Sequence, residues 1–163
     1  MSTYWVQINH LVTGWRKIIG NDHFKSFLMA MDNKMKLGSS AKKFIIGGIE
    51  VDHDKGAIGH SDADVVIHVI CDSILGALGE GDIGKHFPDT DERFRGIDSK
   101  ELLVEVMKIL KKKNFEINNV DVTVLLERPK LRDHIDSMIE VLSDVMKIRK
   151  DKLSIKATTT EGL

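Results

Sequence analysis

The sequence predicts an α/β sandwich, in which one mixed sheet is covered by helices on one face. Segments with apolar residues at helical spacing alternate with short β-branched segments, which is typical of this class. A chain of 163 residues with 42% hydrophobic and 30% charged side chains fits one compact domain with a substantial core. The uncovered sheet face would be buried against other subunits, so we expect a homo-oligomer.

Composition excludes several classes of function. A net charge of −1 gives no long-range field for a nucleic-acid partner, so any phosphate must be bound by local groups or metal ions. The single cysteine, Cys71, excludes an intrachain disulfide and indicates a reducing compartment. No apolar run approaches the roughly 18 residues that would suggest a membrane span. We therefore expect a soluble protein with no membrane partner.

Residues 1–31 form an unassigned N-terminal extension. They mix Trp5 and Trp15 with Asn and His, lack a secretory apolar core, and hold too few arginines for an organelle transit peptide. A natural extension, a cloning remnant and a stretch of altered reading frame all stay open.

The first predicted strand covers residues 43–51, which read KFIIGGIEV. Gly47-Gly48 within it indicates a bulge or a close backbone approach. A helix then begins at Ser61 or Asp62 as its cap and ends near Leu78. Its apolar side consists of Ile67, Ile70, Ile74 and Leu78.

Asp64, His68 and Asp72 recur at every fourth position of this helix and therefore share one side of it. A metal-bound imidazole usually donates its second N–H to an acid, and Asp64 or Asp72 could serve His68 in that way. The alternative interpretation is a core histidine satisfied by a helix neighbour. A Gly-rich loop with acids follows the helix, so we interpret residues 59–91 as the floor of an active site.

The remaining elements follow from ordinary signals. Asp98 and Glu101 resemble a capping box that starts a second helix, and Lys111–Lys113 close it at its negative end. Residues 115–126 alternate as one strand, which ends before Pro129. The last two elements are a helix over about residues 133–146, whose methionines fill the core, and a short strand in residues 152–163.

Several blocks of residues stand in order along the chain. They are Gly59-His60-Ser61-Asp62-x-Asp64 with His68, DIGKHFPDTD at 82–91, VDVT at 120–123, Pro129-Lys130, and KATTTE at 156–161. Together they resemble the family of 2-C-methyl-D-erythritol 2,4-cyclodiphosphate synthase, over about residues 44–161. Several independent blocks at matching spacing are far more specific than any single motif.

The resemblance implies a lyase of the non-mevalonate route to isoprenoids, working as a homotrimer with active sites at the subunit interfaces. Its substrate would be 4-diphosphocytidyl-2-C-methyl-D-erythritol 2-phosphate, whose 2-phosphate attacks the β-phosphorus and expels CMP. The implied location is the cytoplasm of a bacterium, or a plastid-type organelle in a eukaryote. Zinc and a second ion, magnesium or manganese, would hold the phosphates.

The resemblance also implies a role for individual residues, carried over motif by motif. The metal ligands are His68 and Asp32 for zinc and Glu161 for the second ion, and the catalytic candidates are His60 and Thr159. The substrate-binding residues are Ser61, Asp82, Gly84, Phe87, Asp89 and Asp91 on the phosphate and erythritol side, and Pro129, Lys130, Leu131, Ala157 and Thr158 on the cytidine and diphosphate side.

The sequence departs from the family at two places. Where the family carries Asp-x-His, this chain has Asp32 followed by Lys34, and an ammonium group cannot ligate zinc. His53 is an alternative ligand, although we expect a solvated loop histidine there. The domain over residues 32–163 also stops before the family's final strand, which predicts an unpaired sheet edge. An inactive or truncated relative that binds a cytidine nucleotide or only assembles is the alternative function.

Overall fold

The computed structural model describes residues 43–53, 56 and 61–159 in full. Of the remaining chain it describes the backbone of six short strands, at residues 6–7, 11–17, 23–28, 32–33, 36–37 and 57–58.

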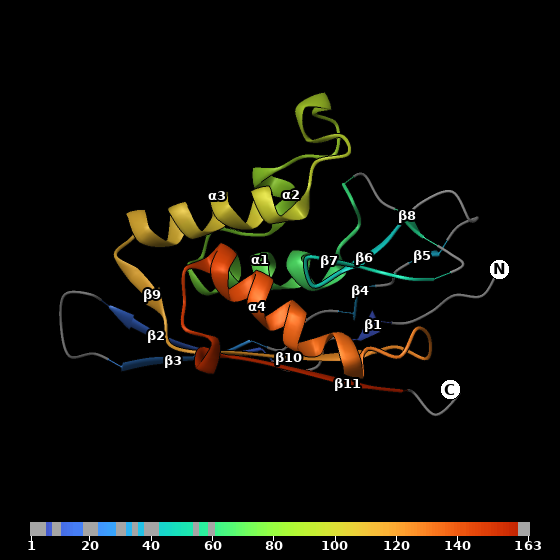
Figure 1. Ribbon diagram of the computed structural model, residues 1–163. Coiled ribbons are helices and arrows are strands. Elements are labelled where there is room, and N and C mark those ends of the chain that lie inside the picture. The colour runs from blue at the N-terminus through green and yellow to red at the C-terminus, as the bar shows by residue number, and fades with distance from the viewer. Residues whose placement is uncertain are drawn as a thin grey trace.

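Helices and small sheets make up the fold. Helices α1 (Val65–Ala77), α3 (Ser99–Lys112) and α4 (Ile135–Met146) lie on one side of strands β10 (Val120–Leu125) and β11 (Leu153–Thr158), as Figure 1 shows. The predicted mixed α/β class is confirmed. The described strands pair in sheets of two or three, so one continuous mixed sheet stays a prediction.

Strands from the N-terminal part pair mainly with one another. β2 (Leu11–Lys17) and β3 (His23–Leu28) are antiparallel, and β2 also pairs with β9 (Phe115–Ile117). The other antiparallel pairs are β1 (Val6–Gln7) with β4 (Asp32–Asn33) and β5 (Lys36–Leu37) with β8 (Ala57–Ile58).

The predicted strand over residues 43–51 is instead a hairpin of β6 (Phe44–Ile46) and β7 (Ile49–Val51). Gly47 and Gly48 form its turn, with φ of +64° and +81°, so of the two predicted alternatives the bulge is wrong and the close backbone approach is confirmed. Two consecutive positive φ values suit a tight hairpin turn, where glycine carries no steric penalty. A Cβ at Gly47 would also lie 2.7 Å from Cγ of Met138 on α4, so the turn packs directly on that helix.

Helix α1 is buried on most of its surface and forms the centre of the core. Val66, Ile67, Ile70, Ile74 and Leu75 are fully buried, as an apolar helix surrounded by other elements requires. Its N-cap is Asp64, so the predicted caps at Ser61 and Asp62 are two or three residues too early. A short helix α2 (Ile83–His86) and a single turn η1 (Glu92–Phe94) follow before α3.

The second and third long helices begin and end close to the predicted positions. Asp98 caps α3 by accepting the N–H of Lys100, and a turn η2 (Arg132–His134) leads into α4. Both helices are amphipathic and turn their apolar faces inward, with Leu103 and Leu142 fully buried.

Strands β9 and β10 correct a further prediction. The predicted single strand over residues 115–126 breaks at Asn118-Asn119, and its two parts pair with different partners. β10 runs parallel to β11, which follows the turn η3 (Lys150–Lys152), in a register that places Val122 opposite Ile155 and Leu125 opposite Thr158. Residues of β10 alternate between buried and half-buried, as predicted.

Candidate active site

The carboxylate of Asp64 joins the start of α1 to the β6–β7 turn. It accepts the N–H groups of Gly47 (2.9 Å) and Gly48 (2.6 Å) from the turn and those of Val66 and Ile67 (both 3.1 Å) from the helix. The side chain is fully buried. Four backbone donors satisfy this buried charge, which without them would be very costly.

Burial raises the pKa of Asp64 from its ordinary value of 3.8 to about 6. The N–H groups of Gly48, Ile67 and Gly47 oppose this shift because they stabilise the anion, and the charge of Asp62 adds to it. At neutral pH the group is an anion held by backbone donors.

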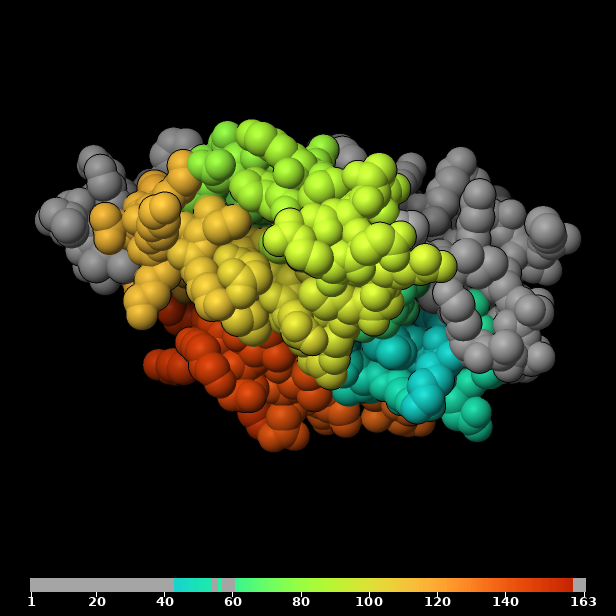
Figure 2. Space-filling model, turned by 90° about the horizontal axis from the view of Figure 1, so that it is seen from above, coloured from blue at the N-terminus to red at the C-terminus, as the bar shows by residue number. Residues whose placement is uncertain are grey.

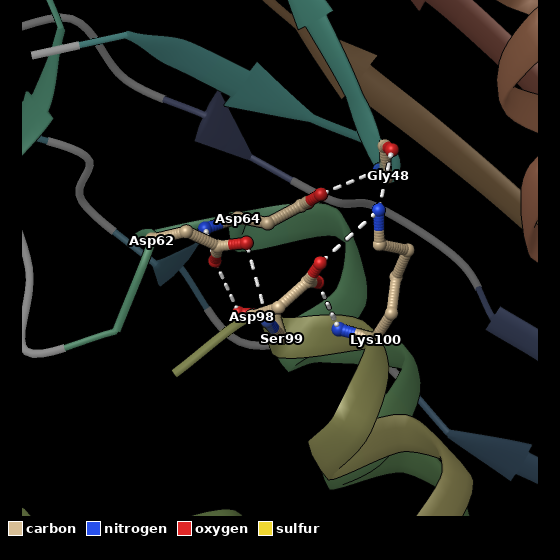
Figure 3. Close-up of polar contacts among 6 residues, drawn as sticks. All are labelled: Gly48, Asp62, Asp64, Asp98, Ser99 and Lys100. Carbon is tan, nitrogen blue, oxygen red and sulfur yellow. Dashed lines mark hydrogen bonds and ion pairs between the residues drawn. The ribbon is translucent and has the colours of Figure 1, made fainter. Parts of the chain in front are cut away.

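A second carboxylate, Asp62, joins the loop before α1 to the start of α3. It accepts the N–H of Ser99 at 3.1 Å and the hydroxyl of Ser99 at 2.5 Å. Beside it, Lys100 pairs with Asp98 at 3.2 Å and donates to the carbonyl of Gly48 at 3.4 Å (Figure 3). In the space-filling view of Figure 2, the surface of the β6–β7 hairpin, coloured cyan, lies next to the yellow surface of α3.

The imidazole of His68 lies against this network. Its Nε2 is 3.0 Å from Oγ of Ser61 and 3.1 Å from Oγ of Ser99. The carboxylates predicted to serve it have other partners: Asp64 binds backbone N–H groups, and Asp72 accepts the N–H of Ile83 at 2.7 Å. The prediction that one of them hydrogen-bonds the imidazole is therefore wrong.

Two opposing effects set the proton affinity of His68. Burial lowers its pKa, while the negative charges of Asp62 and Asp72 act in the opposite direction. Burial is the larger effect, so at neutral pH the ring is neutral. A neutral imidazole keeps a lone pair, which a metal ligand or a base requires.

The loop after α1 is hydrogen-bonded to the same helix. Asp72 lies one turn beyond His68 and binds the N–H of Ile83, so it brings α2 against α1. Asp82 caps α2 through the N–H of Lys85. The predicted substrate residues of this region lie along one loop, where Asp82, Gly84 and Asp89 are exposed and Phe87 and Asp91 are half-buried.

Two contacts stabilise the outer part of this loop. The ring of Phe87 packs edge to face on Phe94, with the centroids 5.4 Å apart. The carboxylate of Asp91 accepts three contacts from the side chain of Arg93, which lowers its pKa.

The predicted cytidine side lies at the carboxyl ends of β10 and β11. These ends meet because the two strands are parallel, and the N–H of Leu126 donates to the carbonyl of Thr158 at 2.9 Å. Ala157, Thr158 and Lys130 are exposed. The other predicted residues here are Pro129 and Thr159, which are half-buried, and Leu131, which is buried in the core.

Within the described residues, the two predicted groups lie in different parts of the chain's fold. In Figure 1 helix α2 lies above α1, whereas the carboxyl ends of β10 and β11 lie below α4 and to its right. His60 and Glu161 are outside the described residues, and Asp32 is described only as backbone in β4.

The described side chains do not by themselves complete a zinc site. Zinc takes about four N, O or S ligands, and His68 contacts two serine hydroxyls. Within the fully described ranges, no three His, Cys, Asp or Glu side chains are grouped to hold a metal ion. The ring of His53 is half-buried and packs edge to face on Phe44, so the solvated loop histidine that we predicted is wrong.

Ser99 is the site residue that the sequence did not reveal. It directly follows the Asp98 cap. A serine at the start of a helix is common and does not by itself indicate a functional role. Its contacts with Asp62 and His68 cross 37 and 31 positions of sequence, so no local pattern signals them.

The described residues thus form a mixed α/β fold with a polar network around His68, an acid-rich loop and exposed strand ends. The sequence profile of the YgbB family matches residues 29–163, and the chain belongs to this family. The chain is 54% identical over 122 residues to the 2-C-methyl-D-erythritol 2,4-cyclodiphosphate synthase of Clostridioides difficile (strain 630), covering 75% of this chain and 76% of that one. It is 50% identical over 128 residues to the enzyme of the same name from Francisella tularensis subsp. novicida, covering 78% and 80%.

A solved structure of a 2C-methyl-D-erythritol-2,4-cyclodiphosphate synthase in a CDP-bound form has a similar fold. Its TM-score is 0.76 at 28% identity, and the match covers 94% of this chain and 91% of that one. The resemblance predicted from the sequence blocks is confirmed. Among the described helices, none combines the length and apolar character needed to cross a bilayer.

Proposed function

We propose that the chain converts 4-diphosphocytidyl-2-C-methyl-D-erythritol 2-phosphate to 2-C-methyl-D-erythritol 2,4-cyclodiphosphate and CMP. The observation that carries the proposal is the 54% identity over 122 residues to a relative of that name. Bacterial relatives also support a place in the cytoplasm and in isoprenoid biosynthesis by the non-mevalonate route.

The reaction needs no co-reactant. An oxygen of the 2-phosphate forms a bond to the β-phosphorus, and the bond from that phosphorus to the bridging oxygen breaks, so CMP leaves with the bridging oxygen and its electron pair. Catalysis is then mainly a matter of positioning and charge stabilisation. No residue of the protein has to become a covalent nucleophile.

Different residues would carry the two ends of the substrate. On the phosphate and erythritol side we assign His60 and Ser61 in the loop before α1, with Asp82, Gly84, Phe87, Asp89 and Asp91 in the loop after it. On the cytidine side we assign Pro129, Lys130, Leu131, Ala157, Thr158 and Thr159. A related structure binds CDP, which supports a cytidine nucleotide as ligand.

We also propose a homotrimer whose active sites lie between subunits. The two groups of residues lie apart in one chain, so a complete site would take the His68 side from one subunit and the β10–β11 ends from a neighbour. The exposed ends of these strands are available for such a contact.

Divalent cations belong to the same proposal. Zinc would use His68 and Asp32, and magnesium or manganese would use Glu161; bound ions would neutralise phosphate charge. The protein's own part is to orient the imidazole through Ser61 and Ser99 and to fix the acid-rich loop through Asp72.

Incubation of the purified chain with this substrate, zinc and magnesium tests the proposal. We expect release of CMP together with a cyclic diphosphate, followed by phosphorus NMR, and loss of both in His68→Gln. Absence of CMP release with zinc and either magnesium or manganese would contradict the enzyme and favour a relative that binds nucleotide or only assembles. Elemental analysis of the same sample gives its zinc content.

A further inference from the structure

Ser99 has one hydroxyl proton, and its Oγ has three polar neighbours among the side chains that the structure describes. Its Oγ lies 2.5 Å from Oδ1 of Asp62, 3.1 Å from Nε2 of His68 and 3.3 Å from Oγ of Ser61. Ser99 is 0% exposed, so its proton must be directed at one of these groups rather than at solvent.

The carboxylate of Asp62 is the strongest acceptor of the three. It also accepts the N–H of Ser99 at Oδ2 and the N–H of Asp64 at Oδ1, both at 3.1 Å. A hydrogen bond to a charged carboxylate is roughly twice as strong as one between neutral groups, and this contact is also the shortest. The hydroxyl proton of Ser99 therefore points to Asp62, and a lone pair of its oxygen faces His68.

We propose that Ser99, oriented by Asp62, is a positioning residue that holds His68 with its proton on Nε2 and its lone pair on Nδ1. A lone pair of Ser99 facing a lone pair of Nε2 would be repulsive, whereas an N–H at Nε2 makes a hydrogen bond. Ser61 can accept the same N–H, since its Oγ lies 3.0 Å from Nε2 and its hydroxyl oxygen has two lone pairs, of which one accepts the N–H of Ala63.

The consequence concerns which ring nitrogen of His68 offers a lone pair. Fixing the proton on one ring nitrogen sets both the tautomer and the ring orientation, as partners of functional histidines commonly do. Nδ1 is then the nitrogen with a lone pair for a cation or a proton. This use of Nδ1 rests on the proposed function; the tautomer itself does not.

Long-range proton–nitrogen NMR of protein labelled with ¹⁵N-histidine tests the tautomer, without metal or substrate and at neutral pH. His68→Gln assigns the His68 signals. In the wild-type chain we expect Nε2 protonated and Nδ1 unprotonated. Protonation on Nδ1 would overturn the proposal whatever the variants do.

The variants test the roles of Ser99 and Asp62. Asp62→Asn removes the strong acceptor and lets Ser99 donate to the ring, so the ratio of the Nε2–H to the Nδ1–H form should fall at least about tenfold. Ser99→Ala should lower it as well, whereas Ser99→Thr keeps the hydroxyl and the ratio. Ser143→Ala is the matched control, because the hydroxyl of this buried serine donates to the carbonyl of Glu140, away from His68. Unchanged ratios in Asp62→Asn and Ser99→Ala would overturn the proposal.

The rate of CMP release gives a second readout. We expect Ser99→Ala to lower it by about 10- to 100-fold, as loss of a histidine's supporting partner typically does, while Ser143→Ala leaves it unchanged. An equal rate in Ser99→Ala and wild type would contradict the positioning role. If the wild-type chain releases no CMP, the proposed function fails, and the NMR measurement still decides the tautomer.

Discussion

The surroundings of His68 and the carboxyl ends of β10 and β11 are held in place in different ways. Around His68, the side chains of Asp62, Asp64 and Asp72 bind backbone N–H groups of other elements, and Asp64 is fully buried. At the strand ends, the main chains of β10 and β11 pair with each other, and side chains such as Lys130 are exposed.

This difference has a physical consequence. Buried carboxylates with several hydrogen-bond donors fix one arrangement within a single chain. Removing such a carboxylate strongly lowers the free energy of unfolding. Replacing exposed side chains on a paired backbone changes the stability of the fold little. These side chains are therefore available for a ligand or a neighbouring subunit. We therefore expect mutations to destabilise the fold in the first region and to affect binding in the second.

The largest expected effect is that of Asp64→Ala. It leaves four buried N–H groups without their acceptor, and we expect a loss of about 3 to 5 kcal/mol in the free energy of unfolding. Asp121→Ala on β10 is the matched control, because its partner Lys156 is exposed and the pair is worth less than about 1 kcal/mol. Urea denaturation of both variants measures the difference; similar losses would contradict the contrast between the regions.

The pH dependence of stability tests the same carboxylate through Asp64→Asn, which keeps the shape of the side chain and removes its charge. The folded-state pKa of Asp64, about 6, lies above its ordinary value of 3.8, so its contribution is most favourable below about pH 4 and declines as the pH rises through 6. The stability of wild type relative to Asp64→Asn should thus fall by roughly 2 kcal/mol between pH 4 and pH 7. A flat difference across this range, in urea titrations at several pH values, would exclude the raised pKa.

Gly48→Ala examines the hairpin turn that Asp64 holds. The backbone has φ +81°, and the new Cβ would lie 2.7 Å from Cγ1 of Val141, so we expect a loss of about 2 kcal/mol. Gly79→Ala has a similar φ of +69° but open space around its Cβ, and should lose only about 1 kcal/mol. Thermal unfolding compares them, and equal effects would show that the turn does not pack closely on α4.

Lys130→Ala should have the smallest effect on stability, within about 0.5 kcal/mol. We expect CDP to bind about tenfold more weakly, since an ammonium group near a diphosphate contributes on the order of 1.4 kcal/mol. Lys150→Ala, an exposed lysine that pairs with Glu140, is the control and should leave CDP binding unchanged. Isothermal titration of both variants makes the comparison.

The sequence predicted the helices well because each has its own apolar periodicity. It misplaced the cap of α1, since Ser61, Asp62 and Asp64 are all good caps, and the choice depends on Gly47 and Gly48, which lie 17 and 16 positions away. It also missed the break between β9 and β10, although the alternation of apolar residues changes phase at Asn118-Asn119, from odd positions before this pair to even positions after it. The two parts pair with different strands.

Within the candidate site, the motifs predict substrate-binding roles for the loop residues and the strand ends, and these roles stay predictions. The partners of His68 were predicted wrongly, since helical spacing favoured Asp64 and Asp72. Both carboxylates instead bind backbone N–H groups, and the hydroxyl of Ser99 reaches the ring from the start of α3. Such long-range choices depend on burial, which a single sequence does not display.

Co-expression of His68→Ala with Lys130→Ala chains tests most directly whether the two regions meet across subunits. At low substrate concentration, His68→Ala alone should be nearly inactive and Lys130→Ala about tenfold less active than wild type. Equal mixing into trimers should give one intact site in every mixed trimer and restore about a quarter of wild-type CMP release. Activity of the mixture no higher than that of the separate variants would show that the two regions do not share a site between subunits.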